Sequence, residues 1–275
     1  MPAVTASLIK ELRDRTGAGM GDCKKALEAV EGDLDKAIEK LRMDGAAKAD
    51  KKAGRTAAEG LIAVASNAEA VALVEVNCET DFVAKGEDFR SLARDAARIA
   101  LEQRPASIEA LVALKAGDAT LDERRRTLVG KIGENLTIRR VEIVVSAGGP
   151  LVTYIHPGDK IAVALALKAG SEDLAKDLAM HIAAMSPRAV DPASISADVI
   201  AAERRIIEAQ VAQEQAEDAA AGKKAKPAEI VAKMLEGKVA KFLDEQTLIG
   251  QPFVKNDAYG LKADAKVRDL LAKEK

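Results

Sequence analysis

The chain has 275 residues, enough for roughly two or three small domains. It carries 42 lysine and arginine residues against 44 aspartate and glutamate residues, and its formal net charge of −2 argues against a protein held to nucleic acid mainly by phosphate attraction. Hydrophobic residues make up 48% of the chain but aromatic residues only 2%, a composition that excludes overall disorder and favours closely packed, alanine-rich helices.

The N-terminal residues predict a small helical module. Three short apolar stripes at helical spacing occupy residues 1–45, and breaks at 17–19 and 31–33 separate them. Asp33 is a suitable N-cap for the third helix. We therefore expect a three-helix module over residues 1–45, followed by a linker rich in alanine and lysine over residues 46–59.

The middle of the chain changes to the pattern of strands. Two β-rich runs around the turn at Asn67 and Ala68 predict a hairpin, and two later runs flank a turn at Pro157–Asp159. Helices are expected after each hairpin, so the order strand, turn, strand, helix occurs twice and indicates an internal repeat. The sequence thus predicts a two-lobed α+β core, with an N-subdomain over 60–146 and a C-subdomain over 147–194.

The last part of the chain is again helical. Two charged helical runs separated by the Gly- and Lys-rich turn at 222–227 predict an antiparallel helical hairpin over 195–242 that projects from the core. The C-subdomain is expected to continue after this hairpin. Residues 243–275 form a C-terminal module with one short helix.

No stretch approaches the roughly 18–20 apolar residues of a membrane span, and no signal peptide is recognised at the N-terminus. Cys23 and Cys78 lie far apart without a CxxC motif, which favours a reducing, cytoplasmic environment. Together with His156 and His181, they do not make an ordinary structural zinc site. We expect a cytoplasmic protein without a cofactor, a metal site or membrane association.

Catalytic motifs are poorly represented. The glycine-rich stretch at 17–21 follows a helix rather than a strand, so a turn between helices is favoured over a phosphate-binding loop, and the chain has no GxxxxGK[ST] motif. Cys78 alternates with buried-type valines and is interpreted as a buried thiol, not a nucleophile. His181 lies on an apolar helix face as a core histidine. The arginines at 124–126 and 139–140 are interpreted as solvated, because acidic residues are interleaved with them.

The connection at Thr80–Val83 is the strongest candidate for a binding site. It lies between a strand and a helix, where the corresponding connection of the second lobe is short, and it carries one of only 4 phenylalanines. Apolar residues on a loop of a rigid scaffold often bind a partner. The competing interpretation, that Phe82 folds back into the core, stays open at this point. His156, at a strand end before a turn, is a candidate partner contact or plain surface.

Five stretches carry a resemblance to a known family. They are LRDRTGAGMGDCKKAL (12–27), EVNCETDFVAKGEDF (75–89), GENLTIRR (133–140), HIAAMSPRAV (181–190) and LIGQPFV (248–254). In this order, and over nearly the whole chain, they resemble the bacterial elongation factor Ts family, the nucleotide exchange factors of elongation factor Tu. The resemblance implies a ubiquitin-associated-like N-terminal module, a core of two α+β subdomains, a helical hairpin and a C-terminal module.

The resemblance also implies a function for the connection. By its residues Thr80, Asp81, Phe82 and Val83, the protein is expected to disturb the Mg²⁺ site of elongation factor Tu and promote GDP release in translation elongation. The partner is expected in its GDP-bound and nucleotide-free forms, without direct contact to nucleic acid. Two other functional classes compete with this interpretation: an enzyme, for which the sequence offers no nucleophile–base pair, and a helical RNA- or ribosome-associated binding module.

Overall fold

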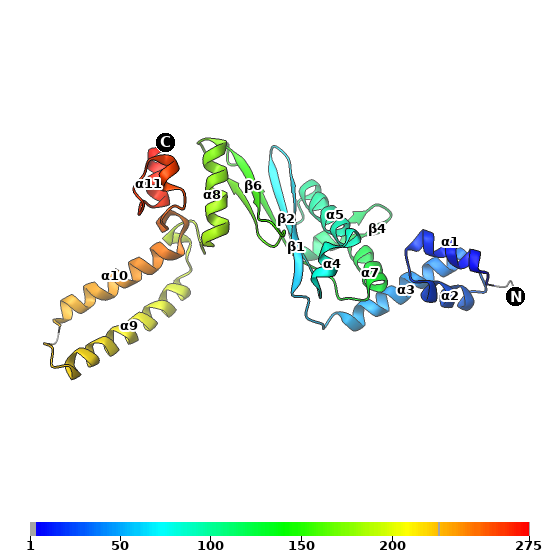
Figure 1. Ribbon diagram of the computed structural model, residues 1–275, viewed down its shortest axis with the longest axis horizontal. Coiled ribbons are helices and arrows are strands. Elements are labelled where there is room, and N and C mark those ends of the chain that lie inside the picture. The colour runs from blue at the N-terminus through cyan, green and yellow to red at the C-terminus, as the bar shows by residue number, and fades with distance from the viewer. Residues whose placement is uncertain (1–3, 225, 275) are drawn as a thin grey trace. The chain divides into compact units, whose positions relative to one another are not determined.

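The computed structural model describes residues 4–224 and 226–274. The chain is a mixed α+β protein with N-terminal helices and small antiparallel sheets, as the sequence predicts (Figure 1). It forms two compact units, the first ending at Lys168 and the second beginning at Ala169. This division falls after the second strand hairpin.

Three helices form the N-terminal part of the first unit: α1 (Ala6–Thr16), α2 (Met20–Ala29) and α3 (Leu34–Lys52). The glycine-rich stretch is a turn between helices, as expected: Gly17 ends α1 in the left-handed conformation with φ 67°. Asp33 caps α3 by accepting hydrogen bonds from two backbone N–H groups. The three helices share a small core, built from Leu12, Cys23, Ala26, Leu27 and Ala37.

Helix α3 differs from the expectation, because it runs through the first half of the predicted linker. Alanine and lysine are good helix formers, and α7 (Leu121–Ile132) gives this extension a surface to pack on. The two helices approach closely at two glycines: a Cβ added to Gly130 would lie 3.0 Å from the Cα of Gly45. Asp50 on α3 also pairs with Arg126 on α7 at 3.1 Å.

A three-stranded antiparallel sheet forms the centre of the first unit. Strands β1 (Glu59–Ser66) and β2 (Ala70–Cys78) make the predicted hairpin, and β5 (Thr137–Val145) pairs with the other edge of β2. Asn67 closes the hairpin turn by accepting hydrogen bonds from the N–H groups of Glu69 and Ala70.

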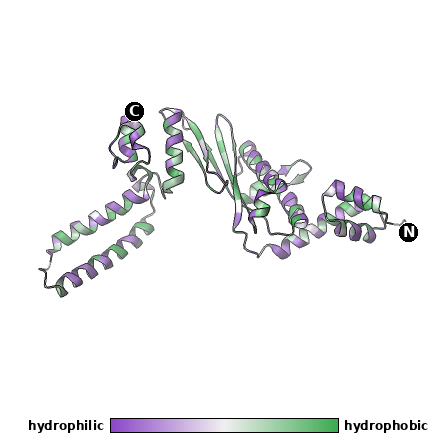
Figure 2. Ribbon diagram, in the orientation of Figure 1, coloured by the Kyte–Doolittle hydropathy of each residue, from purple (hydrophilic) through white to green (hydrophobic). Residues whose placement is uncertain are grey.

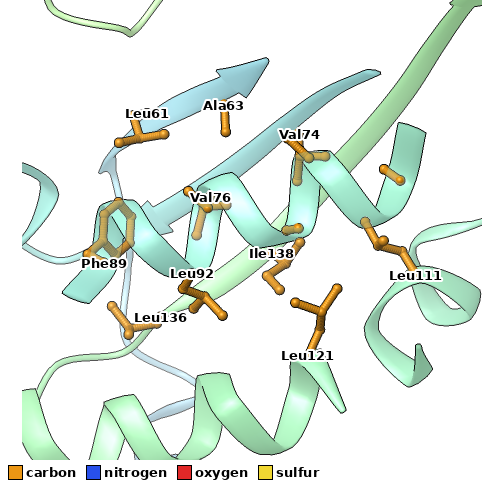
Figure 3. Packing of buried hydrophobic residues seen from close by; sticks show 14 of the residues in the cluster. Leu61, Ala63, Val74, Val76, Phe89, Leu92, Leu111, Leu121, Leu136 and Ile138 are labelled. Carbon is orange, nitrogen blue, oxygen red and sulfur yellow. The ribbon is translucent and has the colours of Figure 1, made fainter. Parts of the chain in front are cut away.

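Helix α5 (Glu87–Gln103) covers one face of this sheet, because its apolar residues recur at helical spacing. Figure 3 shows Phe89 and Leu92 of α5 close to Val76 of β2 and Leu136, within the main hydrophobic core. The predicted helices at 88–103 and 121–133 therefore match α5 and α7. Three further elements are too short to show a periodic pattern and were not expected: α6 (Ile108–Ala113) and the two-residue strands β3 (Lys115–Ala116) and β4 (Ala119–Thr120).

A second hairpin completes the first unit. Strands β6 (Leu151–Ile155) and β7 (Ala162–Ala166) pair with each other in antiparallel register. The turn between them is joined to the first sheet, since the carbonyl of Asp159 accepts a hydrogen bond from the N–H of Ile62 at 2.7 Å and its carboxylate pairs with Arg90 of α5 at 2.7 Å.

The second unit is helical. It contains α8 (Glu172–Met185), α9 (Ala197–Ala220), α10 (Ala228–Gln246) and α11 (Val267–Lys273), with 3₁₀ turns at Pro192–Ser194, Leu248–Gly250 and Asn256–Tyr259. Helices α9 and α10 form the predicted hairpin, and hydrophilic and hydrophobic residues alternate along both (Figure 2). Their apolar residues meet in a narrow strip that includes Ile207, Val211 and Val239.

A candidate partner-binding site at Phe82

Phe82 is the most exposed large hydrophobic residue of the described chain, with 82% of its surface accessible. It belongs to α4 (Asp81–Lys85), a single helical turn between β2 and α5. The interpretation of Phe82 as a core residue is therefore wrong. An exposed aromatic ring on an ordered element is the arrangement expected of a docking residue, because burial against a partner removes apolar surface from water.

The connection that carries Phe82 is an ordered turn, and not the irregular loop that the sequence suggested. Thr80 caps α4 by accepting a hydrogen bond from the N–H of Val83 at 3.4 Å. Asp81 pairs with Lys85 one turn later at 2.7 Å, and this hydrogen bond lowers the pKa of the Asp81 carboxyl group. Gly86, in an extended conformation, ends the turn.

The turn has a core face and a solvent face. Ala84 is buried and Val83 is half-buried against the main core, whereas Phe82 points away from it. Asp81 is half exposed beside Phe82. Of the four residues predicted for the site, Asp81 and Phe82 are thus the accessible ones, and Thr80 and Val83 fix the turn in place.

A residue from elsewhere in the chain, not predicted from the sequence, contacts this turn. The carboxylate of Glu134, between α7 and β5, accepts hydrogen bonds from the N–H groups of Glu79 and Thr80 at 3.1 and 3.0 Å. Its second oxygen accepts from the Thr80 hydroxyl group at 2.7 Å. The only sequence signal was its place in GENLTIRR, one of the stretches that carry the family resemblance.

His156 is exposed at the end of β6, in the turn that Asp159 ties to the first sheet. Its Nδ1 lies 3.1 Å from the hydroxyl group of Tyr154. The flanking Ile155 and Ile161 are 44% and 42% exposed, so His156 lies on a locally apolar surface. His156 is therefore accessible at this surface.

Cys78 and His181 are both buried, as expected from the sequence. Cys78 is buried, and burial raises the pKa of its thiol to about 11, so the thiol is protonated at neutral pH and is a poor nucleophile. His181 is buried in the second unit, with Nε2 3.2 Å from Oε1 of Gln251. Among residues 4–224 and 226–274, no group of three or more His, Cys, Asp or Glu side chains is arranged to hold a metal ion.

The arginine clusters are paired with carboxylates. Arg124 pairs with Asp95 at 2.6 Å, and Arg126 pairs with Asp122 at 2.8 Å. On β5, both arginines of the second cluster pair with the single carboxylate of Glu75. Such pairing agrees with the interpretation of these clusters as solvated surface. Within the described part of the chain, no helix is long and apolar enough to cross a membrane.

Comparison with known proteins agrees with the resemblance. A family model described as "Elongation factor TS" matches residues 79–274. The elongation factor Ts of Methylococcus capsulatus is 50% identical over 258 residues, which are 92% of this chain and 84% of that protein. That of Francisella tularensis subsp. novicida is 47% identical over 274 residues, 99% of this chain and 90% of its own. Because both the model and these relatives cover most of the sequence, the chain belongs to the elongation factor Ts family.

Proposed function

We propose that the protein binds elongation factor Tu in its GDP-bound form, disturbs the Mg²⁺ site of that partner and so promotes GDP release. Membership of the elongation factor Ts family makes it an exchange factor of translation elongation rather than an enzyme. The observation that carries the detailed proposal is the exposed Phe82 on an ordered turn, inside one of the stretches that carry the family resemblance.

The acceleration of GDP release can be compared with the free energy that burial of Phe82 supplies. An exchange factor must bind the nucleotide-free partner better than the GDP-bound one, and GDP then weakens the binding of the factor by the same coupling free energy. Each tenfold acceleration of GDP release requires about 1.4 kcal/mol off the dissociation barrier. Burial of one phenylalanine side chain contributes about 1.5–3 kcal/mol, so Phe82 can account for roughly one to two decades.

Asp81 is proposed to act on the Mg²⁺ ion of the partner. Magnesium is held largely through oxygens and water molecules, so a carboxylate nearby competes for the hydrogen bonds of its hydration shell. In the free protein Asp81 is ionised and paired with Lys85, and both side chains are largely accessible. Exchange of this weak surface pair for contacts with the partner therefore costs little.

If the protein accelerates GDP release by more than the one to two decades assigned to Phe82, other residues must also contact the partner. We assign this holding role to the N-terminal three-helix module and to the exposed turn at His156, whose surroundings are apolar. The protein is proposed to act in the cytoplasm, without a cofactor of its own. It is proposed to make no direct contact with nucleic acid, because its arginine clusters are paired with carboxylates.

The test is stopped-flow release of fluorescent GDP from elongation factor Tu, measured over a range of factor and free Mg²⁺ concentrations. The protein is expected to accelerate release, and Phe82→Ala to lose one to two decades of that acceleration. Absence of any acceleration by the wild-type protein contradicts the proposed function. Tight binding of free GDP in calorimetry, without the partner, also contradicts it.

A further inference from the structure

We infer that Glu134 is a positioning residue for exchange: it holds the turn α4 so that Phe82 is presented to the partner in one fixed orientation. This inference rests on the proposed function of Phe82. Glu134 is far from Phe82 in the sequence. Its side chain is partly buried, and its carboxylate accepts hydrogen bonds from Thr80 at the base of the turn.

The contacts of Glu134 are directed at the two residues that precede α4. One carboxylate oxygen accepts from both backbone N–H groups, of Glu79 and Thr80, and the other accepts from the Thr80 hydroxyl group at 2.7 Å. Thr80 in turn caps α4. The side chain of Glu134 thus accepts from two backbone N–H groups just after β2. It also orients the Thr80 hydroxyl group, which caps the turn.

The connection is reciprocal. The Glu134 carboxylate accepts a hydrogen bond from the backbone N–H of Glu79. In return, the Glu79 carboxylate accepts one from the backbone N–H of Asn135 at 2.6 Å. The buried Asn135 side chain then donates to the carbonyls of Ala53 and Arg55, just after α3, at 3.4 and 2.8 Å. The base of the Phe82 turn is therefore joined to the chain between α7 and β5, and through Asn135 to the end of α3.

A helix of one turn needs such support. Isolated short helices are not stable in water, because fixing the first turn orders several residues for one hydrogen bond. On its core side α4 is held by Ala84 and Val83, but nothing in the described chain covers Phe82. If the base of the turn were free, ordering it on binding would reduce the affinity for the partner.

The charge of the carboxylate strengthens the hydrogen bonds at this position. Glutamine can keep its one oxygen on the two backbone N–H groups and donate its own N–H to the Thr80 hydroxyl oxygen, because a hydroxyl group both donates and accepts. Glu134→Gln therefore replaces charge-assisted hydrogen bonds by weaker neutral ones at nearly unchanged volume. This weakening is expected to amount to about tenfold in an equilibrium or a rate.

The first experiment tests the connection without the partner. Amide hydrogen exchange is measured on the full chain for wild type, Glu134→Gln and the control Glu142→Gln, which alters an exposed glutamate on β5. We expect about tenfold faster exchange at Glu79 and Thr80 in Glu134→Gln only, with the protection of the central sheet retained. Unchanged exchange at these two amides overturns the inference, and so does a loss of protection spread over the whole sheet.

The second experiment is a double-mutant cycle on stimulated GDP release. Glu134→Gln is expected to slow release by about tenfold at subsaturating factor, but to have a clearly smaller effect in the Phe82→Ala background, where only Asp81 is left on the turn to contact the partner. Equal losses in both backgrounds would show that Glu134 does not act through Phe82, and would overturn the inference. If Phe82→Ala alone leaves release unchanged, it is the proposed function that fails, and amide exchange still decides whether Glu134 holds the turn.

Discussion

Phe82 and Phe89 lie on consecutive helices, α4 and α5, with opposite environments: Phe82 is 82% exposed and Phe89 is 0% exposed. The same substitution at the two positions separates binding from folding. We expect Phe82→Ala to reduce stimulated GDP release by one to two decades and to leave the melting temperature nearly unchanged. Phe89→Ala removes a ring from the main core and should destabilise the fold by about 3–5 kcal/mol.

Calorimetric melting and stopped-flow GDP release, measured on the same preparations, check this pair. Exchange activity is expressed per folded molecule, so that a partly unfolded Phe89→Ala protein does not count as inactive. A Phe82→Ala variant that melts several degrees lower, yet exchanges normally per folded molecule, would assign Phe82 to the fold rather than to the site.

Asp81→Ala tests the action on the Mg²⁺ ion of the partner. If Asp81 competes for the hydration shell of the ion, its removal should slow exchange mainly when free Mg²⁺ is abundant, and lowering free Mg²⁺ should partly restore the rate. The matched control is Lys85→Ala, which removes the other member of the surface pair but keeps the carboxylate. A deficit of Asp81→Ala that is the same at all Mg²⁺ concentrations would argue against this role.

Elements with a periodic apolar pattern could be predicted from the sequence, but the details that depend on distant neighbours could not. The hairpin around Asn67 and the helix around Phe89 follow from local spacing and turn chemistry. The contact of α3 with α7 was missed because two isolated glycines carry no signal of a close approach. The hydrogen bonds at the base of the Phe82 turn were missed for a related reason, since their acceptor, Glu134, is remote in the chain.

The close approach of α3 and α7 makes Gly130 sensitive to any side chain. A Cβ at Gly130 would already lie 3.0 Å from the Gly45 Cα, a backbone atom that has little room to yield. Gly130→Val should therefore destabilise the first unit by about 1–3 kcal/mol through overpacking. Gly237 in α10 has no heavy atom within 4 Å of its added Cβ, so Gly237→Val is the matched control and should leave stability nearly unchanged.

Denaturant unfolding, followed by amide exchange in α3 and α7, measures this difference. Equal stability of the two valine variants would mean that the helices separate readily at the glycine contact. In that case the N-terminal helices would not be held to the core through α7.

His181 predicts a pH dependence of the second unit. It is buried, with Nε2 at hydrogen-bond distance from Gln251 and Nδ1 without a hydrogen-bond partner among the described residues. Burial lowers the pKa of His181 below its ordinary value of about 6.5. The unfolded chain thus binds a proton at a pH where the folded chain does not. The stability contributed by neutral His181 is fully present above about pH 6.5 and declines as the pH falls below that value.

We therefore expect the melting temperature of the second unit to fall as the pH is lowered below about 6.5, and to fall less steeply in His181→Gln. The comparison of slopes isolates the histidine, because the carboxylate of Asp177, which Tyr259 and Lys255 bind nearby, is present in both proteins. His181→Gln is expected to be less stable at every pH, since it disturbs a packed ring 5.5 Å from that of Phe253, so only the slope is diagnostic. Parallel melting curves against pH would show that His181 binds its proton equally well in the folded and unfolded chain, contrary to its buried position.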